Sequence, residues 1–345
     1  MIRLAGAPAP GPTLLWAVGT PAKGVEGGAV PDPGLRDALL RRLNAPPWPM
    51  SWPMSWPMTG TTERVVVRAG PTGDPFRLRA LLAGGPGEPV LLVAPRRWGP
   101  RRLVPAPVVE GSPVGLLLAT RASHLPPAPA LSDSVVHRPQ AAPPGPPWVV
   151  AAMAKDVFLR PTDGWADTLN RAGCPTLDLR ADRARRSDLA AALGKGPGVV
   201  LYAGHGRNRG WGGYQGLRLP HLAAAGPEET GPEEAAPRPA GLVIAFACDT
   251  LKRSRSRTPF GIGLVEAGCA RAYLGAVGSL RTSDAEALAE VVIPLLAHRS
   301  HATVASLLQG IEGAVGATGA ARRAWRSFRL IGDPLTPLTP PTSAG

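Results

Sequence analysis

The chain has 345 residues, a length that accommodates two domains, and its hydrophobic content of 44% is enough for a sizeable core. Its formal net charge of +13 would suggest a nucleic-acid partner, but only four of the 38 basic residues are lysine. An arginine-rich, lysine-poor composition is what GC-rich coding produces, and the sequence has no basic helix face and no interleaving of aromatic and basic residues. The composition therefore argues against a nucleic-acid partner.

Cysteine usage and apolar runs narrow the class further. The chain has three cysteines, none of them in a CxxC pair, so neither a zinc ribbon nor a disulfide framework is indicated. No apolar run approaches the roughly 18 residues that a membrane-spanning helix needs. Pro8, Pro10 and Pro12 interrupt the apolar stretch that a signal peptide would require. We therefore expect a cytoplasmic protein without a membrane span.

Short strands are expected in the N-terminal half, separated by proline-rich loops. The segment "PWPMSWPMSWPM" (47–58) repeats Trp-Pro-Met at a spacing of prolines that excludes a regular helix or a central strand. This repeat is either an insert in a surface loop or a tryptophan-bearing segment that docks a partner or the second domain. The predicted elements of this half are strands at 13–18, 63–68, 89–94 and 114–120 and a helix at 34–43.

A Pro/Ala-rich stretch divides the chain, and such composition is typical of linkers. We expect an accessory or regulatory domain at 1–122, a linker at 123–147, a second domain at 148–338 and a disordered tail at 339–345.

From Trp148 onward, strands alternate with helices. "WVVAAM" (148–153) is a continuous apolar run, typical of a strand buried on both faces, and Ser187 and Ser283 are expected to cap helices. This alternation predicts an α/β fold with a doubly wound, mostly parallel sheet and helices on both faces. The predicted strands are 148–153, 175–179, 199–202, 242–247 and 272–277, and the predicted helices are 164–172, 188–193, 260–268, 284–298, 303–316 and 321–328.

Two residues that suit nucleophilic catalysis follow neighbouring predicted strands. Ligands of open α/β sheets bind beyond the carboxyl ends of the strands, so His205 and Cys248 are expected at one edge. A thiol with an imidazole as general base and acid is what thiol catalysis needs. Taken alone, a histidine between glycines is more often a surface turn residue, and a cysteine at a strand end is more often a small core residue. Their predicted convergence favours the catalytic interpretation.

The neighbourhood of this pair supports the same interpretation. Gly206 offers an unhindered backbone N–H where the attacked carbonyl oxygen would become an oxyanion. The other cysteines suit the role less, because Cys174 precedes a strand and Cys269 ends an apolar helix. The alternative is a zinc site built from the pair and His221, but their spacing matches no metal motif.

Four segments in order resemble the caspase-like cysteine peptidases, and within them the gingipain-type (C25) and CHAT branches. The segments are "VVLYAGHG", "GLVIAFACDT", "FGIGLVEAGCARAYLGAVGS" and "RLIGDPLTPL". In that family the third strand ends in a His-Gly that carries the base, the fourth ends in the nucleophilic cysteine, and a Gly-Asp-Pro motif closes the domain. The resemblance covers about residues 148–338 and implies a caspase-like catalytic domain there.

The resemblance also implies roles for individual residues. His205 is the general base, Cys248 is the nucleophile, and the backbone N–H groups of Gly206 and Cys248 form the oxyanion hole. Family members with basic specificity place an acidic residue just after the first strand, where this chain has Asp156. A buried carboxylate selects a guanidinium or ammonium group by charge-assisted pairing. The alternative for Asp156 is a solvated turn residue.

Further substrate-binding candidates lie near the pair. Asp249 and Asp284 are second candidates for the acidic pocket, and Trp211 is expected either as a wall of the cleft or as a tryptophan that caps the sheet. The segment "LKRSRSRTP" (251–259) is a candidate self-cleavage site or pseudosubstrate, with a solvated basic loop as the alternative. Its basic residues are Lys252, Arg253, Arg255 and Arg257.

These features predict a caspase-like cysteine endopeptidase that cleaves after Arg or Lys and uses no cofactor and no metal. Its expected partner is a protein or peptide substrate, with the product of a neighbouring gene as a candidate, in a bacterial defence or cell-death pathway. The alternative is a catalytically silent CHAT-like scaffold or signalling module that recruits partners through its N-terminal region.

Overall fold

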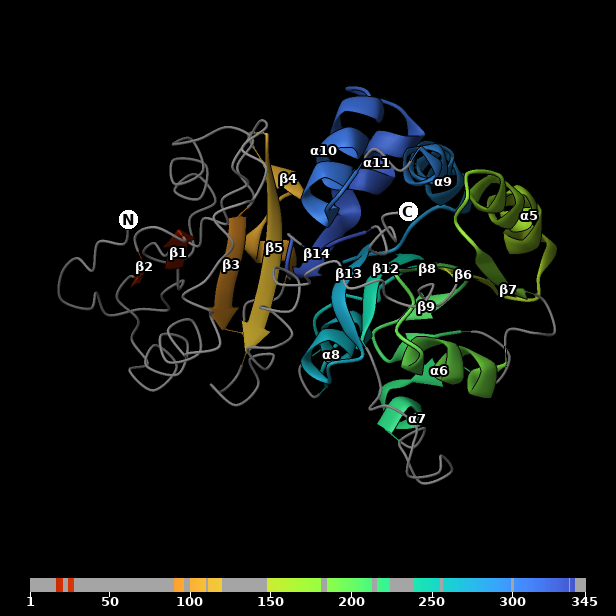
Figure 1. The fold of residues 1–345 in the computed structure, drawn as a ribbon, viewed down its shortest axis with the longest axis horizontal. Helices are drawn as coiled ribbons and strands as arrows, with labels where there is room; N and C mark the ends of the chain where they lie inside the picture. The colour runs from red at the N-terminus through yellow and green to blue at the C-terminus, as the bar shows by residue number, and fades with distance from the viewer. Residues whose placement is uncertain are drawn as a thin grey trace, which may run out of the picture.

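The computed structural model describes residues 17–20, 24–27, 90–95, 100–109, 111–119, 148–180, 185–212, 216–223, 239–254, 257–298, 301–334 and 336–338. A nine-stranded sheet with helices on both faces dominates these residues (Figure 1). Two short strands, β1 (Ala17–Thr20) and β2 (Gly24–Gly27), form a separate antiparallel pair. Five predicted features lie outside the described residues: the strand at 63–68, the helix at 34–43, the repeat at 47–58, the linker at 123–147 and the tail at 339–345.

The sheet is mostly parallel, as the alternation of strands and helices predicted. The five strands from β13 to β7 run parallel to one another, whereas β14 runs antiparallel to β13. Each of these five strands begins and ends within two residues of its predicted bounds. In spatial order the strands are β3 (Val90–Pro95), β5 (Ser112–Ala119), β14 (Phe328–Gly332), β13 (Ala270–Ala276), β12 (Ala240–Phe246), β8 (Val199–Ala203), β6 (Trp148–Ala152) and β7 (Thr176–Arg180), and β4 (Val108–Val109) pairs with β5.

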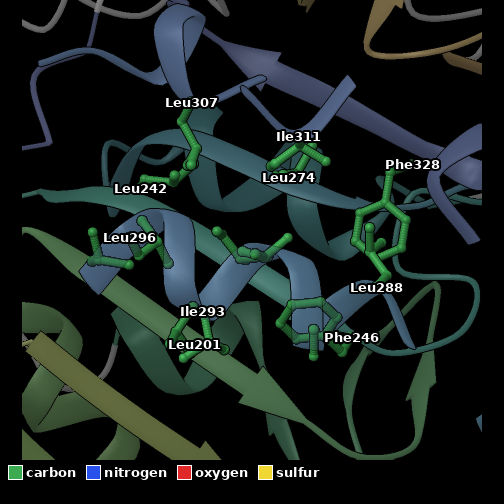
Figure 2. Packing of buried hydrophobic residues seen from close by; sticks show 14 of the residues in the cluster. Leu201, Leu242, Phe246, Leu274, Leu288, Ile293, Leu296, Leu307, Ile311 and Phe328 are labelled. Carbon is green, nitrogen blue, oxygen red and sulfur yellow. The ribbon is translucent and has the colours of Figure 1, made fainter. Parts of the chain in front are cut away.

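Two apolar layers cover the two faces of the sheet because successive strand residues point to opposite faces. On β12, Leu242 and Ile244 pack into one layer, whereas Val243 and Ala245 pack into the other. Figure 2 shows the first layer, where side chains of α9 and α10 meet those of β8, β12 and β13. The helices are α3 (Pro100–Leu103), α5 (Asp156–Arg171), α6 (Arg186–Gly194), α7 (Leu219–Ala223), α8 (Phe260–Glu266), α9 (Thr282–Ala297), α10 (Val304–Ala314) and α11 (Ala320–Ser327).

Helix α5 begins eight residues earlier than the predicted start at Gly164. Pro161 lies inside the helix, where it removes one backbone N–H donor. In a sequence, a proline at such a position indicates a helix break, which explains the late predicted start. The helix nevertheless buries a mostly apolar face against the sheet. Its buried residues are Phe158, Thr162, Trp165, Ala166 and Leu169.

The two predicted serine caps are wrong. Helices α6 and α9 each begin one residue before the expected cap, with Arg185 and Arg281 at the N-cap positions and no side-chain cap hydrogen bond. Thr303 does cap α10 with its side chain, which accepts from the Ser306 N–H while the Ser306 hydroxyl accepts from the Thr303 N–H.

Strand β14, which the sequence did not predict, joins the C-terminal region to strands from residues 90–119. Leu330 and Ile331 of β14 are in parallel register with Gly115 and Leu116 of β5. The Arg329 side chain is 3% exposed and donates from Nε to the carbonyl oxygen of Val104 at 2.6 Å. Strands from both sides of the 123–147 segment therefore lie in one sheet.

Among the residues that the structure describes, no helix is both long enough and apolar enough to cross a membrane.

Candidate active site

His205 and Cys248 lie at the same edge of the sheet, beyond the carboxyl ends of adjacent strands. Strands β8 and β12 are parallel, and Ala203 is the register partner of Phe246. His205 comes two positions after Ala203, and Cys248 comes two positions after Phe246. The two loops therefore leave the sheet side by side. The His205 side chain is exposed, and Cys248 is half-buried.

A small antiparallel sheet shapes the loop that carries His205. Its strands are β9 (Gly206–Arg207), β10 (Gly210–Trp211) and β11 (Leu217–Arg218). The Gly212 N–H donates to the His205 carbonyl oxygen at 2.7 Å, which makes these two residues a hydrogen-bonded pair. The next pair, Gly206 with Trp211, is then of the non-hydrogen-bonded kind. The Gly206 N–H therefore points away from β10, toward the free edge of this sheet.

Gly206 packs directly against the loop of Cys248. A Cβ atom added to Gly206 would lie 2.4 Å from the carbonyl oxygen of Cys248 and 2.8 Å from Cβ of Ala247. Only glycine permits so close an approach of two backbones. The backbone N–H of Cys248 itself donates to no backbone carbonyl within the described ranges. The resemblance assigns the N–H groups of Gly206 and Cys248 to an oxyanion hole. The loops that carry them are in contact, and neither N–H takes part in the hydrogen bonds between β9 and β10.

The loop after β13 holds the thiol of Cys248. The Leu280 N–H donates to Cys248 Sγ at 3.3 Å, and the thiol lies 3.5 Å from the Leu280 carbonyl oxygen. The next residue, Asp249, has a φ of 58°, a left-handed conformation that is uncommon outside glycine. Its N–H donates to the Gly278 carbonyl oxygen at 3.0 Å, so the strained turn is anchored to the same loop.

The His205 ring packs against α5 and not against the thiol. Its centroid lies 5.0 Å from that of Phe158, with the two rings at 85°. In the described part of the chain, no hydrogen bond joins this ring to Cys248. Phe158 and Leu280 are therefore two neighbours of the pair that the sequence did not single out for a role. The signal for Leu280 was its place three residues after the end of the predicted strand 272–277.

The three acidic candidates have different surroundings. Asp156 is the first residue of α5 and is exposed, so the burial expected of a pocket floor is not observed. Asp249 is half-buried; its Oδ2 lies 3.4 Å from Nζ of Lys252, and its Oδ1 is buried without a hydrogen-bond partner in the described residues. Asp284 is 7% exposed and accepts two hydrogen bonds from Arg323, at 2.8 and 3.3 Å.

Asp284 thus serves to join α9 to α11 and does not fit the substrate-binding role. The hydrogen bond from the Arg323 guanidinium is the largest cause that lowers the pKa of the Asp284 carboxyl below its usual value. Sequence spacing gave no sign of this pair, because the partners are 39 residues apart.

Trp211 also does not fit the predicted role as a wall of the cleft. It is 2% exposed and stacks on Tyr202, with centroids 4.3 Å apart and an interplanar angle of 7°. Its indole N–H donates to the Tyr273 hydroxyl at 3.3 Å. The aromatic side chain packs inward. The sheet-capping alternative describes its position.

The basic segment after Cys248 is exposed where the structure describes it. Lys252, Arg253 and Arg257 are exposed, and Arg255 lies outside the described residues. Among the described residues of this segment, Lys252 is the one that forms an ion pair, with Asp249.

The remaining candidates from the sequence are the other two cysteines and His221. Cys174 is buried, and burial raises the pKa of the half-buried Cys269 thiol. Nδ1 of His221 accepts from the Arg218 N–H at 3.1 Å. Within the described ranges, no cluster of three or more His, Cys, Asp or Glu residues could hold a metal ion.

Comparisons with known proteins agree with this architecture. The model of peptidase family C25 matches residues 151–339, more than half of the chain. Among solved structures, the Arg-specific cysteine proteinase gingipain R (RGPB) is similar, with a TM-score of 0.55 and 14% identity over 72% of this chain and 63% of that one. The complex of the pro- and mature domains of Porphyromonas gingivalis RgpB gives a TM-score of 0.53 and 14% identity over 72% and 64% of the two chains.

At this level of identity the likeness shows the fold alone. The chain spans less than two thirds of the length of the two solved chains. A search of curated protein sequences finds no significant match.

Proposed function

The chain belongs to peptidase family C25, and from this premise we propose that it is a cysteine endopeptidase in which Cys248 is the nucleophile and His205 the general base. One observation carries the proposal. The register of β8 and β12 brings the two side chains to one edge of the sheet, where Gly206 packs against the carbonyl of Cys248.

In the proposed reaction, His205 takes the proton of the Cys248 thiol, and the thiolate attacks the carbonyl carbon of the scissile peptide bond. The Leu280 N–H donates to the sulfur at 3.3 Å and holds the nucleophile in place before the attack. The N–H groups of Gly206 and Cys248 stabilise the oxyanion of the tetrahedral intermediate. The imidazolium then protonates the leaving amine, and a thioester remains. Water, deprotonated by His205, attacks the thioester and releases the acid and the free thiol.

The test compares matched substitutions of cysteine and histidine in the purified protein. We expect Cys248→Ala and His205→Ala to lower kcat for a peptide library on the order of 10³-fold or more. Cys269→Ala and His221→Ala remove the same side-chain types outside the proposed dyad and are expected to retain activity. Full cleavage by Cys248→Ala would refute the assignment of the nucleophile.

The finer proposal is cleavage after Arg or Lys. A carboxylate near the nucleophile would pair with the basic side chain, and both Asp156 and Asp249 lie at the edge that carries Cys248. The structurally similar gingipain R is an Arg-specific cysteine proteinase. Its specificity is a property of that protein, and the similarity of fold supports the proposal of basic specificity for this chain.

Self-cleavage in the 251–259 segment follows from the same specificity. The segment has exposed basic side chains, the first of them four residues after Cys248. They are Lys252, Arg253 and Arg257. The intact mass of the active wild-type protein is expected to show a cut that Cys248→Ala lacks. A single uncut mass for active protein would leave the segment as a solvated basic loop.

A catalytically silent CHAT-like scaffold is the second candidate, and one observation favours it. The thiol of Cys248 is hydrogen-bonded to the Leu280 backbone, and the His205 ring packs on Phe158. A peptidyl electrophile separates the two functions, because an enzyme is labelled at Cys248 in a manner that His205→Ala abolishes. Absence of labelling, with the protein folded, would support the scaffold.

A role in bacterial defence or cell death extends the proposal through the resemblance to caspase-like proteases. The natural substrate would then be a protein, with the product of a neighbouring gene as the first candidate. Incubation of that product with wild type and with Cys248→Ala tests it: cleavage by the wild type alone supports the role.

A further inference from the structure

One peptide unit contributes both the carbonyl of His205 and the N–H of Gly206. A peptide unit is planar, and no cis peptide bond occurs among the described residues. In a trans unit the C=O and N–H bonds point in opposite directions. Whatever fixes the direction of the His205 carbonyl therefore also fixes the direction of the Gly206 N–H.

Two donors hold the His205 carbonyl oxygen. The Gly212 N–H donates at 2.7 Å, as part of the β9–β10 pairing, and the Tyr202 hydroxyl donates at 3.1 Å from the core side of the loop. A carbonyl oxygen accepts two hydrogen bonds, so these donors satisfy it. The peptide plane between His205 and Gly206 is thus fixed from two directions.

The side chain of Tyr202 is itself immobilised. It is completely buried in β8 and stacks on Trp211, whose indole N–H is bonded to Tyr273. Burial raises the pKa of the Tyr202 hydroxyl far above its ordinary value, so it stays a protonated donor at neutral pH. Gly204 leaves room for it, because a Cβ atom there would lie 2.5 Å from the tyrosine oxygen.

We propose that Tyr202 is a positioning residue for the oxyanion hole: its hydroxyl holds the His205 carbonyl and so aims the Gly206 N–H at the oxygen of the carbonyl attacked by Cys248. This inference rests on the proposed peptidase function. The first glycine of Gly204-His205-Gly206 admits the tyrosine hydroxyl, and the second approaches the nucleophile. The histidine between them is flanked by glycine for two separate steric reasons.

The test removes the hydroxyl alone, with Tyr202→Phe, and uses two inhibitors that differ in their need for an oxyanion hole. A peptide aldehyde forms a hemithioacetal whose oxygen occupies the hole, whereas alkylation by iodoacetamide needs only the thiolate. Because the Gly212 N–H remains, we expect about a tenfold fall in kcat and a matching rise in the aldehyde Ki, smaller than the loss of a whole oxyanion donor. KM and the alkylation rate of Cys248, followed by peptide mass mapping, are expected to stay within twofold.

Thr336→Val is the matched control. It also deletes a buried hydroxyl that donates to a carbonyl, that of Asp333 at 2.8 Å, but beyond the end of β14 at the opposite edge of the sheet. It is expected to leave kcat, the aldehyde Ki and the alkylation rate unchanged. Should Tyr202→Phe fold poorly, Gly204→Ala crowds the same hydroxyl and is expected to give the same kinetic pattern.

Three outcomes oppose the inference. An unchanged kcat and aldehyde Ki in folded Tyr202→Phe would overturn it while leaving the peptidase function intact. An equal fall in the alkylation rate would assign the tyrosine to the thiol or to general stability and would overturn it as well. A wild-type protein that neither cleaves peptides nor binds the aldehyde would overturn the proposed function, and this inference with it.

Discussion

A methyl group placed on Gly206 would lie 2.4 Å from the carbonyl oxygen of Cys248, a separation that real Cβ atoms essentially never show. The base loop and the nucleophile loop are therefore in backbone contact. A side chain at position 206 would therefore force one of the two loops to move.

Gly206→Ala is expected to displace the two loops from each other. A misplacement of about 1 Å at reacting groups costs on the order of 100-fold in rate, so we expect kcat/KM to fall by about that factor. Overpacking of this kind destabilises by about 1–3 kcal/mol, which urea unfolding would measure. Gly164→Ala is the control, because nothing lies within 4 Å of its added Cβ on α5. It is expected to retain activity and to gain stability; equal kinetics for both variants would contradict the predicted contact.

Asp249 and Asp156 are expected to differ in their effect on the preference for a basic residue at P1. Within the described residues, the buried Oδ1 of Asp249 has no hydrogen-bond partner, which leaves an acceptor for a substrate guanidinium. Asp156, in contrast, is exposed and screened by water. A hydrogen bond to a charged group contributes about 1.5–3 kcal/mol, so Asp249→Asn is expected to lower the preference for Arg over Gln at P1 by roughly 10- to 100-fold.

Asparagine is the appropriate replacement because it also tolerates the left-handed backbone of Asp249. We expect Asp156→Asn to change the same ratio by less than about threefold, since surface charges contribute little. A larger effect at Asp156 would reverse the assignment and restore the family-based expectation. The ratio of kcat/KM for paired fluorogenic peptides is the measurement.

Acid is expected to remove the stabilising effect of the Asp284–Arg323 pair. Arg323 lowers the pKa of Asp284 in the folded state, so the pair stabilises the fold above the ordinary carboxyl pKa of about 4. That contribution is lost as the pH falls through the lower folded-state value. Arg323→Gln should therefore be less stable than wild type at pH 7, with the difference shrinking below about pH 4.

Arg326→Gln replaces an exposed arginine of the same helix, α11. Its difference from wild type is expected to be small at every pH. Urea unfolding at pH 7, 5 and 3.5 gives both comparisons, and a constant Arg323→Gln effect across this range would show that the pair does not titrate.

The sequence predicted the central sheet well because its strands are almost continuous apolar runs. Trp148–Ala152 and Val199–Ala203 are buried at every position, so the pattern is unambiguous. The edge position of His205 and Cys248 followed from strand order alone. These predictions depend on local composition and a general rule of α/β folds.

What the sequence did not predict depends on partners distant along the chain. Strand β14 contains Arg329, a charge that argues against a buried strand until its acceptor, the Val104 carbonyl, is known. The sequence left two positions open for Trp211, and the stacking on Tyr202 decides between them. Side-chain pairs of this kind are set by tertiary packing, and local pattern carries no information about them.

The contact between Arg329 and Val104 leads to the last prediction, which concerns the N-terminal strands. Arg329→Met keeps most of the side-chain volume but leaves the Val104 carbonyl buried without that donor, at a cost of about 1–3 kcal/mol. Arg326→Met is the matched control, since its side chain is exposed. We expect urea unfolding of the full chain to show a loss only for Arg329→Met.

A fragment of residues 148–338 is expected to show a larger loss, because β14 would then present the edge that β5 covers in the full chain. Uncovered edge strands promote association, so light scattering should detect concentration-dependent oligomers of the fragment and not of the full chain. A monomeric fragment with the thermal stability of the full chain would mean that the C-terminal part folds independently. In that case, β3, β4 and β5 would dock onto a sheet that is already complete.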